Sequence, residues 1–134
     1  MIEKDYLVTS LLYILKDVEG IYFKGGTAIN KLLLENKRLS EDLDFTISEE
    51  LNRIIEEIKT KLKGTIFKDV EKGKSLEGFT RLIIHYKLFH ESGRIFIDLN
   101  QRATLFLKPE KLSVNHFYKE QIPEFEVNCL NKEE

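Results

Sequence analysis

Two aspartates separated by one residue, Asp42 and Asp44, follow a pair of glycines, Gly25 and Gly26, in this chain of 134 residues. Adjacent glycines at a helix N-terminus let backbone N–H groups approach phosphates closely, because no Cβ stands in the way. Clustered carboxylates hold divalent ions that can span the attacking and leaving oxygens of a phosphoryl transfer. The combination favours nucleotidyl transfer from a nucleoside triphosphate.

The two carboxylates share one face if the segment 43–47 is extended, because residues two apart on a strand point the same way. Leu43 and Phe45 would then point into the packing. Taken singly, a Gly-Gly pair is more often an ordinary turn, and an Asp-x-Asp is more often a solvated strand end or cap. Residues 27–41 leave room for one short helix and a return loop, which would bring the aspartates back beside the glycine turn.

A third candidate ligand is Asp98, which lies in the apolar run from Arg94 to Asn100. The β-branched and aromatic residues of this run predict a strand. An acid among apolar neighbours needs a partner or a cation to offset its desolvation. Two interpretations stay open: a third metal ligand that could also act as base, or a charge on an edge strand that discourages aggregation.

Four polar residues flank these motifs. Lys24 and Arg38 could neutralise phosphate charge, a role that suits the planar fork of arginine, although each could equally be a surface residue. Ser40 could orient a phosphate or could be a plain loop hydroxyl. Thr27 is placed to cap the helix that follows the glycines. Spacing typical of a metal site is absent from His85, His90, His116 and Cys129.

The pattern of apolar residues predicts the elements that must position these groups. A first helix over 7–18 ends at Gly20, and a later helix has Ser48 as its cap and Gly64 at its end. The remaining expectations are a strand at 21–23, a short helix at 29–33, strands at 65–70, 79–89, 94–100 and 125–130, a turn at 90–93, and an irregular, partly helical segment between Pro109 and Pro123.

The segments Phe23–Ile29 and Arg38–Phe45 resemble the AbiEii-like toxins. These are nucleotidyltransferases of type IV toxin–antitoxin systems, within the polymerase-β-like superfamily. The resemblance implies transfer of a nucleoside monophosphate from an NTP to an acceptor, with RNA and especially tRNA expected, and an antitoxin protein as a possible partner. It also implies Mg²⁺ or Mn²⁺ on Asp42, Asp44 and Asp98, and nucleotide binding by Lys24, Gly25, Gly26, Thr27, Arg38 and Ser40.

The order of the expected elements suits an α/β (α+β) chain with a mixed β-sheet and helices packed mainly on one face. This agrees with the nucleotidyltransferase fold that the resemblance implies. In such a fold the strand of Asp42 and Asp44 would lie beside the strand of Asp98, with the glycines at the neighbouring strand-to-helix turn. We expect the site at the edge of the sheet.

Composition agrees with one compact domain, because 42% of residues are hydrophobic and 33% are charged. The net charge of −2 gives no general field that attracts a polyanion, so RNA binding would need a local patch. The lysines between Lys59 and Lys74 alternate with acids, and we expect a solvated surface there. Neither a signal peptide nor a run of the ~20 apolar residues of a membrane span is present, so the cytoplasm is the expected location.

Relatives that resemble this chain continue into a helical region with a functional lysine and a further aspartate, whereas this sequence stops at Glu134. We therefore expect residues 1–134 to form a single nucleotidyltransferase-like domain without that region. A second hypothesis follows from the same observation. The chain could be a catalytically inactive or incomplete nucleotide-binding or protein-binding module that needs a helical partner.

Overall fold

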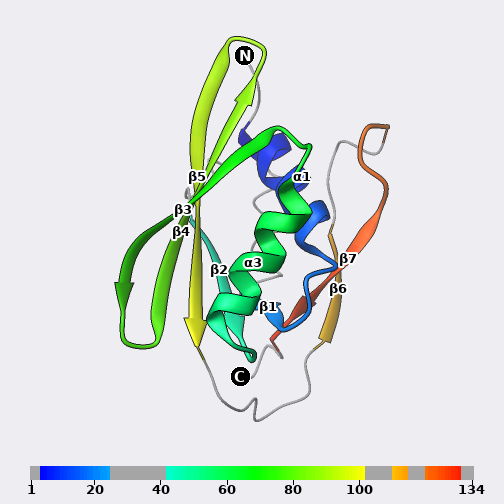
Figure 1. Ribbon diagram of the computed structural model, residues 1–134. Helices are drawn as coiled ribbons and strands as arrows, with labels where there is room; N and C mark the ends of the chain where they lie inside the picture. Colours follow the sequence, from blue (N-terminus) through cyan, green and yellow to red (C-terminus); the bar gives the residue numbers. More distant parts are fainter. Residues whose placement is uncertain (1–3, 25–41, 102–109, 115–119, 131–134) are drawn as a thin grey trace.

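The computed structural model describes residues 4–24, 42–101, 110–114 and 120–130 (Figure 1). In chain order, the elements are α1 (Lys4–Leu15), β1 (Ile21–Phe23), β2 (Asp42–Ile47), α3 (Leu51–Leu62), β3 (Phe67–Leu76), β4 (Phe79–Leu88), β5 (Glu91–Gln101), β6 (Glu110–Val114) and β7 (Phe125–Cys129). In this part of the chain, no helix is long and apolar enough to cross a membrane.

The strands form one seven-stranded mixed sheet with the order β3-β4-β5-β2-β1-β7-β6. Strand β2 runs parallel to β5 and antiparallel to β1, while β1 runs parallel to β7. The two ends of the sheet are antiparallel hairpins, β3–β4 and β6–β7. Strands β2 and β5 therefore lie in the interior of the sheet, with a hydrogen-bonded neighbour on each side.

One face of the sheet carries the hydrophobic core. Alternate residues of the central strands are buried there. Burial of one Leu or Ile side chain stabilises the folded state by roughly 1.5–3 kcal/mol relative to leaving it exposed. These residues are Leu43, Phe45, Ile47, Leu82, Ile84, Ile95, Ile97 and Leu99. They form one cluster with the buried side chains of α1 and α3. Figure 1 shows α3 in front of the central strands and α1 next to α3, so the helices of the described residues agree with the predicted packing mainly on one face.

The second predicted helix forms, but its start differs from the expectation. Helix α3 begins at Leu51 with Glu50 as its N-cap, and the helix has no side-chain capping hydrogen bond. The backbone N–H of Ser48 instead donates to the carbonyl of Gly20 at 3.0 Å, which continues the pairing of β1 with β2 one step beyond the two strands. The prediction that Ser48 caps this helix was wrong.

Two further expectations need correction in the second half of the chain. The segment between the two prolines contains a strand, β6, which pairs with β7. The β4–β5 turn is not at 90–93 but at Phe89 and His90, where Phe89 takes a φ of 54°. Gly93 lies within the ladder opposite Tyr86, and a Cβ at Gly93 would lie 2.7 Å from Cζ of that ring. Gly93 therefore makes room for the ring of Tyr86 and is not part of the turn.

Gly20 joins α1 to β1 with a φ of +87°, and a Cβ added there would lie 3.0 Å from Cβ of Glu49 and closer still to its Cγ. Gly64 has a similar φ of +78°, but nothing lies within 4 Å of an added Cβ. We expect Gly20→Ala to lower the free energy of unfolding by about 2–3 kcal/mol and Gly64→Ala by about 1 kcal/mol, since only the first adds a collision to the backbone strain. Urea denaturation measures both, and equal losses would contradict the predicted collision.

Candidate functional site

The predicted carboxylates meet on the face of the sheet that the core does not use. Asp44 on β2 and Asp98 on β5 are direct partners in the parallel ladder, so their Cα atoms lie on strands about 4.8 Å apart and their side chains leave the same face. The interleaved residues Leu43, Phe45 and Ile97 point into the core. The sequence prediction that the two strands are neighbours is therefore confirmed, but the pair lies in the interior of the sheet rather than at its edge.

Asp98 is buried, with 7% of its surface exposed, and its charge is matched by one arginine. Nε of Arg81 donates to Oδ1 of Asp98 at 2.7 Å, and Nη2 of Arg81 donates to Oδ2 at 3.0 Å. The two residues face each other across the β4–β5 ladder. This two-bond fork is the strongest common geometry for a carboxylate. Because β5 has neighbours on both sides, the interpretation of Asp98 as an edge-strand charge was wrong.

Asp44 is exposed, and its surroundings differ from those of Asp98. Nδ2 of Asn100 lies 3.3 Å from Oδ1 of Asp44 and also 3.3 Å from the carbonyl oxygen of Phe45. Asn100 is two residues beyond Asp98 on β5, so it lies on the same face. The amide of Asn100 thus links the two strands beside the carboxylates.

Lys24, the last described residue before the two glycines, lies next to Asp44. The backbone N–H of Lys24 donates to the carbonyl of Asp44 at 3.0 Å, and Phe23 packs edge-on against Phe45 with 5.2 Å between ring centroids. The end of β1 therefore lies beside the carboxylate pair. Five predicted site residues lie outside the described residues, namely Gly25, Gly26, Thr27, Arg38 and Ser40. For Asp42 the structure describes only its place in β2, in register with Phe96. The roles assigned to all of these site residues stay predictions.

The donor chemistry at this point fits a divalent cation. Carboxylate and amide oxygens are the hard ligands that Mg²⁺ and Mn²⁺ prefer. A nine-tenths buried carboxylate such as Asp98 also requires a positive partner, a need that Arg81 meets in this structure. Among the side chains that the structure describes, which exclude that of Asp42, no group of three His, Cys, Asp or Glu residues comes together.

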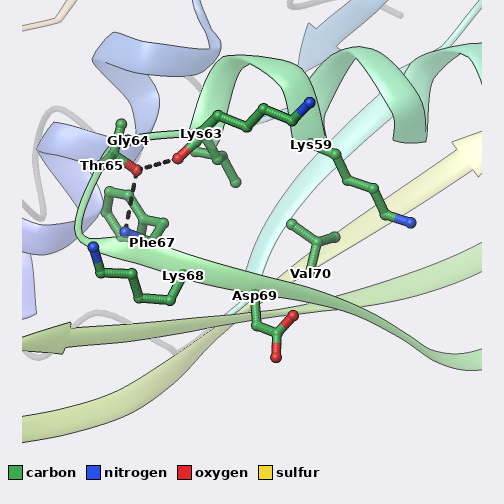
Figure 2. Close-up of a pocket in the computed structure, with 9 residues that line it drawn as sticks. Lys59, Lys63, Gly64, Thr65, Phe67, Lys68, Asp69 and Val70 are labelled. Atoms are coloured by element: carbon green, nitrogen blue, oxygen red, sulfur yellow. Dashed lines mark hydrogen bonds between the residues drawn. The ribbon is translucent and has the colours of Figure 1, made fainter.

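A polar pocket of about 450 Å³ lies elsewhere, between the C-terminal end of α3 and the start of β3 (Figure 2). Lysines from both elements line it, namely Lys59, Lys63 and Lys68. The Thr65 hydroxyl donates to the carbonyl of Leu62 at 2.6 Å and accepts a hydrogen bond from the N–H of Phe67 at 3.1 Å. These two bonds hold the wall of the pocket in place. Strand β3 is three strands away from β2, so this pocket does not belong to the carboxylate pair.

Sequence reasoning missed Arg81 and Asn100. Asn100 could have been found, because it follows Asp98 by two residues on a predicted strand and must share its face. Arg81 could be found only from the register of the β4–β5 hairpin. The true two-residue turn at Phe89 and His90 places Arg81 opposite Asp98. A turn at 90–93 would shift the partner of Asp98 along β4 and hide the ion pair.

The two aspartates should respond differently to loss of charge. We expect Asp98→Asn to lower the free energy of unfolding by about 1–3 kcal/mol, because Arg81 loses the partner of its half-buried charge. We expect Asp44→Asn to change it by less than about 0.5 kcal/mol, because Asp44 is exposed. Urea denaturation measures the free energy of unfolding of both variants. Equal losses in the two variants would show that the Arg81–Asp98 ion pair does not stabilise the fold as a buried interaction.

Two solved structures share this fold. JHP933 from Helicobacter pylori superposes with a TM-score of 0.53 at 23% sequence identity, covering 75% of this chain and 43% of that protein. A second H. pylori protein, provisionally described as a nucleotidyltransferase, gives a TM-score of 0.51 at 23% identity, covering 72% and 43%. The aligned part of this chain thus spans less than half the length of either protein. A search of the curated proteins found no match.

A family profile settles the relationship that the motifs indicate. The profile described as nucleotidyl transferase AbiEii toxin of type IV toxin–antitoxin systems matches residues 10–134, which is most of the chain. The match includes all the strands of the sheet and both carboxylates of the pair. The chain belongs to the AbiEii family of nucleotidyltransferase toxins.

Proposed function

We propose that the chain is a metal-dependent nucleotidyltransferase that moves a nucleoside monophosphate from an NTP to an acceptor, with RNA and especially tRNA as the acceptor. In this role it acts as the toxin of a toxin–antitoxin or phage-defence pair, with an antitoxin as its partner. One observation carries the proposal. Asp44 and Asp98 lie in register on the face of the sheet opposite α1 and α3, here called the open face, and the Lys24 N–H donates to the backbone carbonyl of Asp44.

The proposed reaction joins an acceptor hydroxyl oxygen to the α-phosphorus and breaks the bond from that phosphorus to the oxygen of the leaving pyrophosphate. Asp42, Asp44 and Asp98 would hold Mg²⁺ or Mn²⁺. Such ions, when bound, neutralise the charge that develops on the attacking and leaving oxygens. Asp98 is the chain's candidate to accept the hydroxyl proton at a carboxylate oxygen.

The remaining predicted residues would position the triphosphate. Backbone N–H groups of the Gly25–Gly26 turn and the charges of Lys24 and Arg38 would hold the phosphates, with Thr27 and Ser40 as further hydrogen-bond donors. The β1 end that precedes the glycines is fixed by two sheet bonds. The Lys24 N–H donates to Asp44 at 3.0 Å, and the Leu130 N–H donates to the carbonyl of Phe23 at 3.1 Å.

The pocket lysines support a polymeric acceptor. Lys63 and Lys68 are both exposed; Lys68 lies on β3, three strands or about 14 Å from β2 along the sheet, and Lys63 follows the end of α3 at the same pocket. A small acceptor bound at the carboxylate pair could not reach them, whereas a polynucleotide could place further phosphates against them. Because the net charge of the chain is −2, such local positive charge is what RNA binding would need.

A second function keeps specific support. Both oxygens of Asp98 are occupied by Arg81, and the aligned part of the chain covers 43% of the length of each structural neighbour. These observations also suit an incomplete or inactive nucleotide-binding or protein-binding module that a helical partner completes. Transfer activity of the chain alone separates the two functions.

The decisive variant for transfer is Asp44→Asn, with Asp17→Asn as its control. Both changes remove one exposed carboxylate charge, but Asp17 pairs with Lys16 at 2.8 Å, away from the carboxylate pair. We expect Asp44→Asn to reduce transfer of α-labelled nucleotide into total RNA by at least about a hundredfold, since a metal ligand is lost. Asp17→Asn should keep full activity. Undiminished labelling by Asp44→Asn would refute the proposed site.

The polymeric acceptor is tested by the double variant Lys63→Gln/Lys68→Gln. Its matched control, Lys72→Gln/Lys74→Gln, removes the same charge from exposed positions farther along β3. We expect the pocket variant to weaken RNA binding about tenfold at low salt and to lower the salt dependence of binding, with nucleotide binding unchanged. Fluorescence anisotropy with total tRNA measures this. Equal losses in the two double variants would show that the pocket is not an RNA contact.

A further inference from the structure

The ion pair between Arg81 and Asp98 raises a conflict for the proposed site. The guanidinium donates to both carboxylate oxygens, at 2.7 and 3.0 Å. A divalent cation on the same carboxylate would lie a few ångströms from a second positive charge, in surroundings where Asp98 is only 7% exposed and solvent screens poorly. The two cations therefore compete for one carboxylate.

The surroundings of Arg81 show where its guanidinium would remain after release. Its Cζ lies 4.9 Å from the centroid of the Phe96 ring, a cation–π distance. Phe96 precedes Asp98 by two residues on β5 and lies on the same open face, beside the place of Asp42 in the register. A released guanidinium can thus stay over Phe96, on the side where the triphosphate would bind. Arginine binds phosphate with the same two-bond fork that it uses for carboxylate.

We propose that Arg81 is a positioning residue that holds Asp98 in the free protein and transfers to the nucleotide phosphates on binding, thereby releasing Asp98 to the divalent cation. This inference rests on the proposed function, because it assigns Asp98 to the metal and the open face to the nucleotide. Arg81 would make metal binding depend on nucleotide. A cation alone would then meet an occupied carboxylate.

The proposal predicts opposite effects of one substitution on two ligands. With Arg81→Gln, we expect Mn²⁺ without nucleotide to bind about tenfold more tightly, because the competing charge is gone. We expect α,β-methylene nucleoside triphosphates, each tested singly in EDTA, to bind about tenfold more weakly, because a phosphate partner is gone. Paramagnetic resonance of free Mn²⁺ and isothermal titration calorimetry measure the two affinities.

Arg94→Gln is the matched control. Arg94 lies on the same face of β5 and its Cζ lies 5.2 Å from the centroid of the same Phe96 ring, but it faces His85 rather than Asp98 across the ladder. The Arg94→Gln variant removes the same charge from the same surface, and we expect less than a threefold change in its affinity for Mn²⁺ or for nucleotide. The Mn²⁺ effect of Arg81→Gln should also vanish in an Asp98→Asn background, since Arg81 acts through that carboxylate.

The outcomes are separable from those of the proposed function, because neither binding measurement needs turnover. Tighter Mn²⁺ with weaker nucleotide in Arg81→Gln supports the proposal, even if the natural chain transfers nothing. Weakening of both ligands, or no change in Mn²⁺ affinity, overturns it, even if the chain is active. If Arg81→Gln does not fold, Arg81→Lys serves instead. It keeps the charge but loses the fork, and it should shift both affinities in the same directions by a smaller factor.

Discussion

The parallel pairing of β2 with β5 is the constraint on which the rest of the structure depends. Its register places Asp44 beside Asp98 and, one residue on, Phe45 beside Leu99. Because side chains alternate along a strand, one register fixes both the polar pair on the open face and the apolar pairs in the core. A slip by one residue would bury the carboxylates under the helices, so the core that stabilises the fold also enforces the geometry of the candidate site.

The division of the sheet into two faces explains why a charged pair is tolerated at its centre. Helices α1 and α3 cover one face and bury the apolar residues of the central strands. The opposite face carries Asp44 on β2 and both Asp98 and Asn100 on β5. Asp98 is buried on this face, with 7% of its surface exposed, and its carboxylate is paired with Arg81.

Buried charge has a free-energy cost that only good geometry offsets. The Arg81 fork supplies that geometry, and Phe96 supports the guanidinium from the side. Such an arrangement pairs the carboxylate of Asp98 with a cation from the neighbouring strand. A site of this kind is stable in the free protein, yet it retains a cation and an anion that phosphates and metal ions can each exchange.

The sequence by itself determined the family, the strands of the β4–β5 hairpin, and the expectation that Asp44 and Asp98 share one site. These followed from local periodicity and from motifs whose chemistry is legible in short segments. Only the tertiary structure decided that β5 lies inside the sheet and that Arg81 holds Asp98. Both depend on strand order and on a hairpin register set by where the chain turns, at Phe89 and His90 rather than at Gly93. Local patterns specify which face a residue uses, whereas partners across a ladder are fixed by contacts between segments that are distant in the chain.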